Sequence, residues 1–307
     1  MYWLFLSFLL VPFNALLNIL PRNITKYYST LSIILYNQIL VTIITGLYLL
    51  YQKSFTFYPI AILGGFLISE GMYYIYKGIK KTSDPGLAAA TGQIYLFITA
   101  IASFFMFDSK LSVKSIIGLS IILYGIYEIA NNPNPNNKKQ KSNSWIFYII
   151  IGTIFISLKD LVIKSVGYNV TSNAVDLYSL SFTLFLFAAF VSSIRHYFSY
   201  KTIKPIPANK NINKTIIHTK IIYDQKHYNI MKLLVLVLAT VTFLLNPLLI
   251  YLINNSPNPS YPRAIGSLSV VIAALAGKFI EHDKISKKQI LGMASVILGV
   301  FIVPFSA

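Results

Sequence analysis

Glu70 is the residue of this chain best suited to exchange protons or hold a cation. It lies past the middle of a long apolar run, where an ionised carboxylate costs at least about 2.5 kcal/mol even on lenient membrane-insertion scales. Tyr73 and Tyr74 follow one helical turn later, so their hydroxyls share a face with the carboxylate. The pattern predicts a proton-coupling or cation-binding site, a structural ion pair with a lysine of another helix, or a side chain that reaches the membrane interface.

Lys159 and Asp160 form a second pair of charges inside an apolar run. As neighbours on a helix they point about 100° apart, and exposing both charged side chains to lipid would be costly in free energy. One interpretation is that Lys159 binds an anionic substrate or pairs with Glu70. The other is that Lys159 pairs with a neighbouring helix, while Asp160 and Lys164, four residues apart, form a local pair.

Neutral polar side chains within the apolar runs are further candidates for a binding site. They either line a cavity or bridge membrane helices, a bridge being worth up to about 1–2 kcal/mol. Asn246 is favoured because the following Pro247 frees a backbone carbonyl of the helix. The whole set comprises Gln93, Asn246, Asn14, Asn18, Asn37, Gln38, Thr91 and Ser267.

The composition of the chain is typical of a membrane protein. Of 307 residues, 55% are hydrophobic and 11% are charged, about half the charged fraction of a soluble domain. The net charge of +17 lies almost entirely between the apolar runs, which indicates membrane orientation rather than nucleic-acid binding. The chain has no Cys, its four His show no metal-ligand spacing, and no phosphate-binding loop is present, so we expect no enzyme, cofactor or metal site.

Ten apolar runs are long enough to cross a bilayer, and backbone hydrogen bonding in lipid requires them to be helices. We therefore predict an all-α integral membrane protein with ten transmembrane helices. A polar linker at 131–143 separates residues 1–130 from 144–307, and 200–224 is expected to be a solvent-exposed loop. The predicted spans are 2–20, 32–51, 57–78, 86–107, 113–130, 145–165, 175–195, 231–253, 261–280 and 287–305.

The two halves resemble each other. Several small, basic and proline residues of the first half recur in the second at one constant separation. Because each half has five crossings, the second repeat must enter the membrane upside down, which gives two inverted five-helix repeats. The matched residues are Pro85, Ala90, Gly92, Lys114, Gly118 and Gly125 with Pro259, Ala264, Gly266, Lys288, Gly292 and Gly299.

The distribution of Lys and Arg predicts an orientation. Most of them follow odd-numbered spans, which places those loops in the cytoplasm and both termini outside. Loops after even-numbered spans hold only Lys53, Lys110, Lys114, Lys164 and Arg263.

The repeated segment resembles EamA-type carriers of the drug/metabolite transporter superfamily. The likeness lies in residues 80–91 (KKTSDPGLAAAT), 108–112 (DSKLS) and 118–125 (GLSIILYG), and residues 283–286 (DKIS) repeat the turn between helices 4 and 5. The resemblance implies two inverted five-helix repeats, with helices 1–4 and 6–9 around a central cavity and helices 5 and 10 outside. It also implies cytoplasmic termini, contrary to the loop charges.

These features together predict a secondary transporter in the cell membrane. We expect it to move a small polar metabolite by alternating access, driven by protons if Glu70 is the coupling group. An uncoupled facilitator or channel, and a membrane scaffold or receptor without transport, are the alternatives. The candidate binding residues are Glu70, Tyr73, Tyr74, Gln93, Lys159 and Asn246. The expected partners are the lipid bilayer, a small-molecule substrate and, with coupling, protons, but no nucleic acid.

Overall fold

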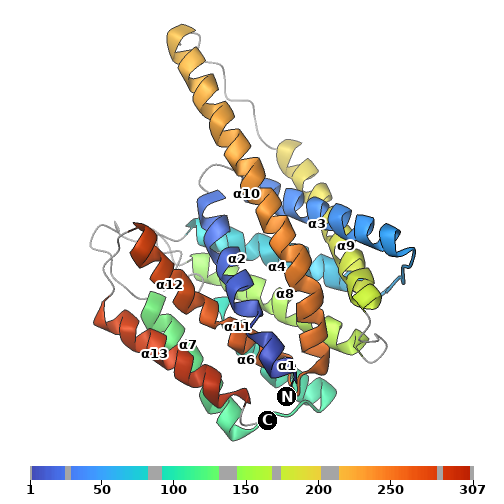
Figure 1. Ribbon diagram of the computed structural model, residues 1–307, viewed down its shortest axis with the longest axis vertical. Coiled ribbons are helices and arrows are strands. Elements are labelled where there is room, and N and C mark those ends of the chain that lie inside the picture. Colours follow the sequence, from blue (N-terminus) through green and yellow to red (C-terminus); the bar gives the residue numbers. More distant parts are fainter. Residues whose placement is uncertain are drawn as a thin grey trace.

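The computed structural model describes residues 2–24, 29–81, 92–130, 144–167, 174–201, 214–281 and 286–304, and every regular element in these ranges is a helix (Figure 1). The first half contributes α1 (Tyr2–Ser7), α2 (Leu10–Ile24), α3 (Thr30–Gln52), α4 (Ala61–Lys81), α6 (Tyr95–Phe107) and α7 (Val113–Ala130). The second half contributes α8 (Ser144–Val166), α9 (Ala174–Lys201), α10 (Lys214–Asn255), α11 (Ser260–Gly266), α12 (Leu268–Glu281) and α13 (Lys287–Ile302).

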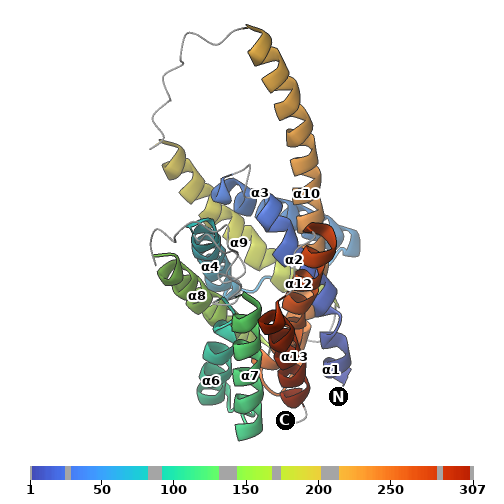
Figure 2. The ribbon, with the colours of Figure 1, turned by 90° about the vertical axis from the view of Figure 1, so that its left-hand side faces the viewer.

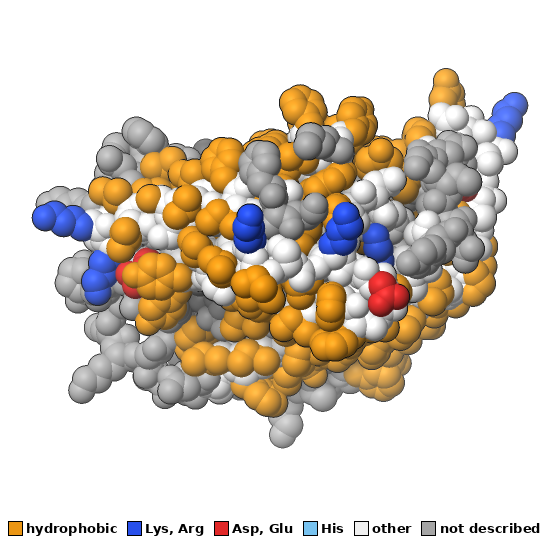
Figure 3. All heavy atoms as spheres, turned by 90° about the horizontal axis from the view of Figure 1, so that it is seen from below, with side chains coloured by type: hydrophobic (Ala, Val, Ile, Leu, Met, Phe, Trp, Pro, Cys, Tyr) orange, Lys and Arg blue, Asp and Glu red, His pale blue; other side chains and the backbone are white. Residues whose placement is uncertain are grey.

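Hydrophobic side chains on the outer surface identify an all-α, multi-pass membrane protein. Leu50 is 75% exposed and Phe105 is 77% exposed, and Figure 3 shows hydrophobic side chains spread over one face between a few charged ones. Four described helical segments are long and apolar enough to cross a bilayer: Thr30–Gln52, Ser144–Val166, Asp176–Ser199 and Lys232–Asn255. The predicted linker 131–143 and the start of the predicted fourth span lie outside the described residues.

Three of the predicted spans are wrong as continuous helices, and the fourth of the ten is one of them, because residues 93–94 form a turn before α6. The first divides between α1 and α2, because Pro12 lies in the first turn of α2 and its ring would clash with the Phe8 carbonyl of an unbroken helix. The amides of Phe8 and Leu9 bond instead to the carbonyls three residues earlier. The ninth span divides at Ser267, between α11 and α12.

The predicted loop at 200–224 is wrong from Lys214 onward. Residues 214–224 form the start of α10, which continues through the apolar segment to Asn255 and projects well beyond the other helices (Figure 1). The loop was predicted from Pro205, Pro207 and the many Asn and Lys residues, and residues 214–224 contain no proline to interrupt a helix. Residues 202–213 of the predicted loop lie outside the described residues.

The most extensive helix contacts join the first half of the chain to the second. α4 packs along α8 and α9, α3 packs along α9, and α7 packs along α13. In Figures 1 and 2, α7 and α13 lie side by side, and α1 and the end of α13 both lie toward the bottom, away from the free end of α10. The halves are therefore interleaved rather than stacked as two separate bundles.

Four glycines allow α7 and α13 to approach closely. A Cβ added to Gly125 would lie 2.5 Å from the carbonyl oxygen of Gly292, and one added to Gly292 would lie 2.5 Å from that of Gly125. Gly118 and Gly299 oppose each other in the same way. Small residues at such crossings bring membrane helices into backbone contact. Because the earlier glycine of α7 faces the later one of α13, the two helices run antiparallel.

Candidate substrate-binding and ion-binding site

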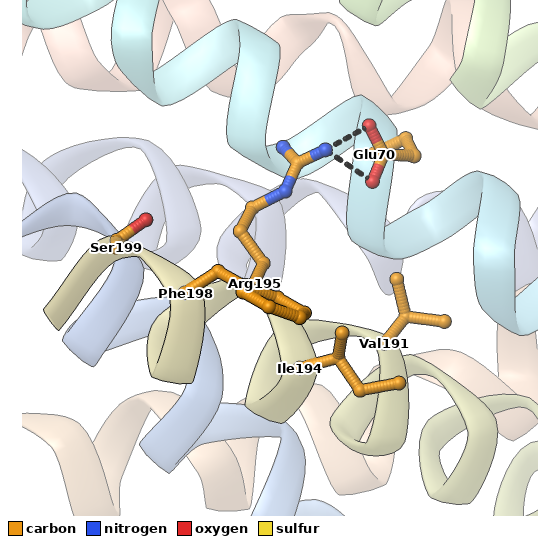
Figure 4. Close-up of a pocket in the computed structure, with 6 residues that line it drawn as sticks. All are labelled: Glu70, Val191, Ile194, Arg195, Phe198 and Ser199. Carbon is orange, nitrogen blue, oxygen red and sulfur yellow. Dashed lines mark hydrogen bonds and ion pairs between the residues drawn. The ribbon is translucent and has the colours of Figure 1, made fainter. Parts of the chain in front are cut away.

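Glu70 of α4 is held by Arg195 of α9. The Arg195 Nη2 donates to both carboxylate oxygens, at 2.6 Å to Oε1 and 2.5 Å to Oε2 (Figure 4). The Glu70 side chain is 8% exposed and that of Arg195 is 25% exposed. This ion pair joins the two halves of the chain.

Aromatic rings surround this pair. The Arg195 guanidinium carbon lies 3.9 Å from the centroid of the Tyr73 ring, within cation–π distance. The Tyr74 ring stacks against Tyr148 and Phe155 of α8. The Lys77 Nζ donates to the Tyr73 hydroxyl at 3.3 Å. We call Glu70, Arg195, Tyr73 and Tyr74 the Glu70 cluster.

The Glu70 cluster borders a shallow, open pocket of about 400 Å³. One face of α9 supplies its other lining residues, Val191, Ile194, Phe198 and Ser199 (Figure 4). The second terminal nitrogen of Arg195, Nη1, is buried and has no hydrogen-bond partner among the described residues. The guanidinium therefore retains unused donors beside the carboxylate.

A second cluster joins side chains of α8 and α11, with Lys159 and Asp160 buried and Arg263 12% exposed. Asp160 accepts from Arg263 twice, from Nε to Oδ2 at 3.0 Å and from Nη2 to Oδ1 at 2.8 Å. The Lys159 Nζ also lies 2.6 Å from Asp160 Oδ1, because its long side chain reaches back to the neighbouring residue. Lys159 is 3% exposed and Asp160 is 0% exposed. We call these three residues the Asp160 cluster.

Tyr95 of α6 connects the Asp160 cluster to the first half of the chain. The Arg263 guanidinium carbon lies 5.7 Å from the centroid of the Tyr95 ring. The Ser157 hydroxyl of α8 donates to the Tyr95 carbonyl at 3.3 Å. Helices of both halves therefore fix the surroundings of the three charges.

The structure corrects two ion pairs that were expected from the sequence. Glu70 pairs with Arg195 rather than with Lys159, because α9 places Arg195 beside it. Asp160 pairs with Lys159 and Arg263 rather than with Lys164. The Lys164 Nζ instead donates to the carbonyls of Ile253, Asn254 and Ser256 at the end of α10.

The other predicted binding residues occupy different positions. The Asn246 Nδ2 donates to the Ser181 hydroxyl at 2.8 Å and so bridges α10 to α9. Gln93 is half-buried in the turn before α6, where its backbone carbonyl accepts a hydrogen bond from the backbone amide of Leu96. Asn246 thus bridges two helices, and Gln93 lies two residues before Tyr95.

The sequence did not predict Arg195 and Arg263 as partners of the buried carboxylates. Both fall within the bounds of predicted spans, Arg195 at the end of 175–195 and Arg263 near the start of 261–280. An arginine inside a span boundary is the signal that could have identified them. In the described part of the chain, no group of three or more His, Asp or Glu is placed to hold a metal ion.

Comparison with known proteins identifies the family. The model of the EamA-like transporter family matches residues 143–305. A crystal structure, titled only "Crystal structure of protein", aligns with 99% of this chain and 98% of its own at a TM-score of 0.74 and 10% identity, a likeness of fold alone. No curated protein matches. Since the family match covers more than half of the sequence, this chain belongs to the EamA-like transporter family, within the drug/metabolite transporter superfamily.

Proposed function

We propose that this protein is a secondary transporter that moves a small polar metabolite across the cell membrane by alternating access. Its ten predicted spans would form two inverted five-helix repeats whose relative movement opens the site to one side at a time. The family supports transport. The substrate, the coupling and the mechanism are our proposals.

The pairing of helices supports the inverted repeats. If each span of one half is exchanged with its counterpart in the other, several of the main helix contacts map onto one another. The α4–α9 contact corresponds to α3–α10, the α6–α8 contact corresponds to α2–α12, and α7–α13 corresponds to itself. In the repeat, Gly125 corresponds to Gly299 and Gly292 to Gly118, so the Gly125–Gly292 contact corresponds to the Gly118–Gly299 contact, which fits a two-fold axis between α7 and α13.

The ion pair between Glu70 and Arg195 is the observation that carries this proposal. Charges buried in a membrane protein are expensive, and they usually mark substrate or ion pathways. A scaffold without transport needs no such pair between its two halves. A proton on Glu70 would remove the charge that holds Arg195, so the pair would connect a proton gradient to the relative position of α4 and α9.

Flux through reconstituted protein tests the proposal. A compound that raises the thermal midpoint in a screen of amino acids, nucleosides, sugars and organic ions is labelled and supplied to proteoliposomes. We expect saturable uptake that a pH gradient accelerates. The variant Glu70→Gln should lose the acceleration and keep part of the exchange, while the exposed-lysine control Lys114→Gln should behave like the native protein.

If flux through the native protein saturates but does not depend on the pH gradient, the protein is not proton-coupled and an uncoupled facilitator is favoured. Flux equal to that of empty liposomes for every stabilising compound would contradict transport itself.

A further inference from the structure

We infer that the Asp160 cluster binds the anionic group of the transported metabolite, a carboxylate or a phosphate. The inference rests on the proposed transport function and names the class of substrate. Lys159 and Arg263 would contact the anion, and Asp160 would hold the two cations in place when the anion is absent.

The charges of the cluster do not balance. Lys159 and Arg263 bring two positive charges to one carboxylate, and no other carboxylate of the described residues lies within ion-pair distance of either cation. An uncompensated charge is costly in an interior of low dielectric constant, where ionisable groups normally occur with a partner. One bound anion would bring the net charge of the cluster to zero.

The hydrogen-bonding capacity of the Asp160 cluster also favours an anionic ligand. Asp160 accepts three contacts, two on Oδ1 and one on Oδ2. An ammonium group carries three N–H donors, and Asp160 is the one acceptor that the described residues place against Lys159 Nζ. Lys159 therefore keeps donors that the described side chains do not use, and a carboxylate or phosphate oxygen can accept them.

The position of the cluster suits a transported ligand. Lys159 and Asp160 are buried, and the partly exposed Arg263 lies 5.7 Å from the ring of Tyr95 of the first half. Close by in the sequence, the ninth predicted span is broken at Ser267. Broken helices commonly form substrate sites at the interface of two repeats. A ligand there would contact helices of both halves.

The net positive charge of the Asp160 cluster disfavours cationic and neutral substrates. An organic cation would meet two positive charges at a site with one carboxylate that is already engaged. A neutral amide or sugar would leave the net charge in place. The Glu70 cluster has one carboxylate and one guanidinium, so its central ion pair has no such excess.

The test measures ligand-induced thermal shifts of the purified full-length protein with matched pairs of compounds. Succinate is compared with its neutral diamide, and glucose 6-phosphate with glucose; choline serves as the cationic probe. We expect succinate or glucose 6-phosphate to raise the thermal midpoint and the uncharged partners and choline to leave it unchanged. The pair that responds distinguishes a carboxylate from a phosphate ligand.

Variants test whether the anion-induced thermal shift arises at the Asp160 cluster. Lys159→Met should fold, since Asp160 and Arg263 remain a complete pair, and it should bind the anion at least tenfold more weakly. Lys114→Gln, which removes an exposed lysine of α7, should bind normally. Asp160→Asn leaves two cations without a counter-ion, so the stabilising effect of the anion should become larger than in the native protein.

Two results would overturn the inference. One is an anion-induced shift that Lys159→Met leaves unchanged; the other is equal stabilisation by the neutral partners or choline. A neutral or cationic compound with saturable flux in proteoliposomes would leave the transporter proposal intact while removing the anionic substrate. Failure of every compound to be transported would instead contradict the proposed function.

Discussion

Replacing Glu70 with glutamine while Arg195 remains leaves a guanidinium without its counter-ion. Removing one partner of a fully buried pair costs about 3–5 kcal/mol. Glu70 is almost buried, but the Arg195 side chain is 25% exposed, so water compensates part of the loss. We therefore expect Glu70→Gln to lower the free energy of unfolding by about 2 kcal/mol.

A double-mutant cycle isolates the ion pair from the other contacts of the two residues. Arg195→Met removes the cation but keeps an apolar chain against the Tyr73 ring. The double variant Glu70→Gln with Arg195→Met should recover at least half of the stability that Glu70→Gln alone loses, because no charge is then left unpaired. Unfolding is followed by titrating SDS into the detergent-solubilised protein, with Lys114→Gln as the exposed control.

An additive result would refute this reasoning. If the double variant is as unstable as the sum of the single variants, with a coupling energy below about 0.5 kcal/mol, the two charges do not stabilise each other. The contact between α4 and α9 would then not depend on this ion pair.

Further predictions concern helix contacts and orientation. Gly125→Ala should destabilise the protein by about 1–3 kcal/mol, because the new Cβ meets the backbone of α13. Gly92→Ala, whose added Cβ would meet no described atom within 4 Å, should not destabilise it, and equal effects of the two variants would contradict the α7–α13 contact. Lys164→Met should lower the free energy of unfolding by about 1–2 kcal/mol, because the hydrogen bonds to three carbonyls are lost, and Lys164→Arg should retain most of the native stability. An unchanged unfolding curve for Lys164→Met would show that these hydrogen bonds contribute nothing. In this Cys-free chain, Ser54→Cys should react with an impermeant maleimide in intact cells and Asn137→Cys should not; the reverse pattern would place the termini in the cytoplasm.

The helical segments were predictable because the bilayer fixes the length and polarity of a crossing segment. Length and hydropathy place α3, α8 and the apolar part of α10 within a few residues of their observed positions. The break before α2 was not predicted, although Pro12 marks it. The start of α10 was also missed, because it follows a segment rich in Pro, Asn and Lys that is typical of a loop.

The candidate site was predictable only as a set of charges. The sequence identifies Glu70, Lys159 and Asp160 as costly charges in apolar segments, but it does not show which helices meet them. Arg195 is a partner because α4 packs against α9, and Arg263 is one because its side chain reaches from α11 to Asp160 of α8; both are properties of the fold. Arginines at the ends of predicted spans are therefore candidates for pairing with buried carboxylates.

Trans-stimulation in proteoliposomes tests the central claim most directly. Alternating access requires a carrier to return its site to the other side, and return with ligand bound is often faster than return when empty. Uptake of a labelled stabilising compound should therefore saturate with concentration, and unlabelled compound inside the vesicles should accelerate it. Uptake that rises linearly with concentration and ignores the compound inside would contradict alternating access and indicate a channel.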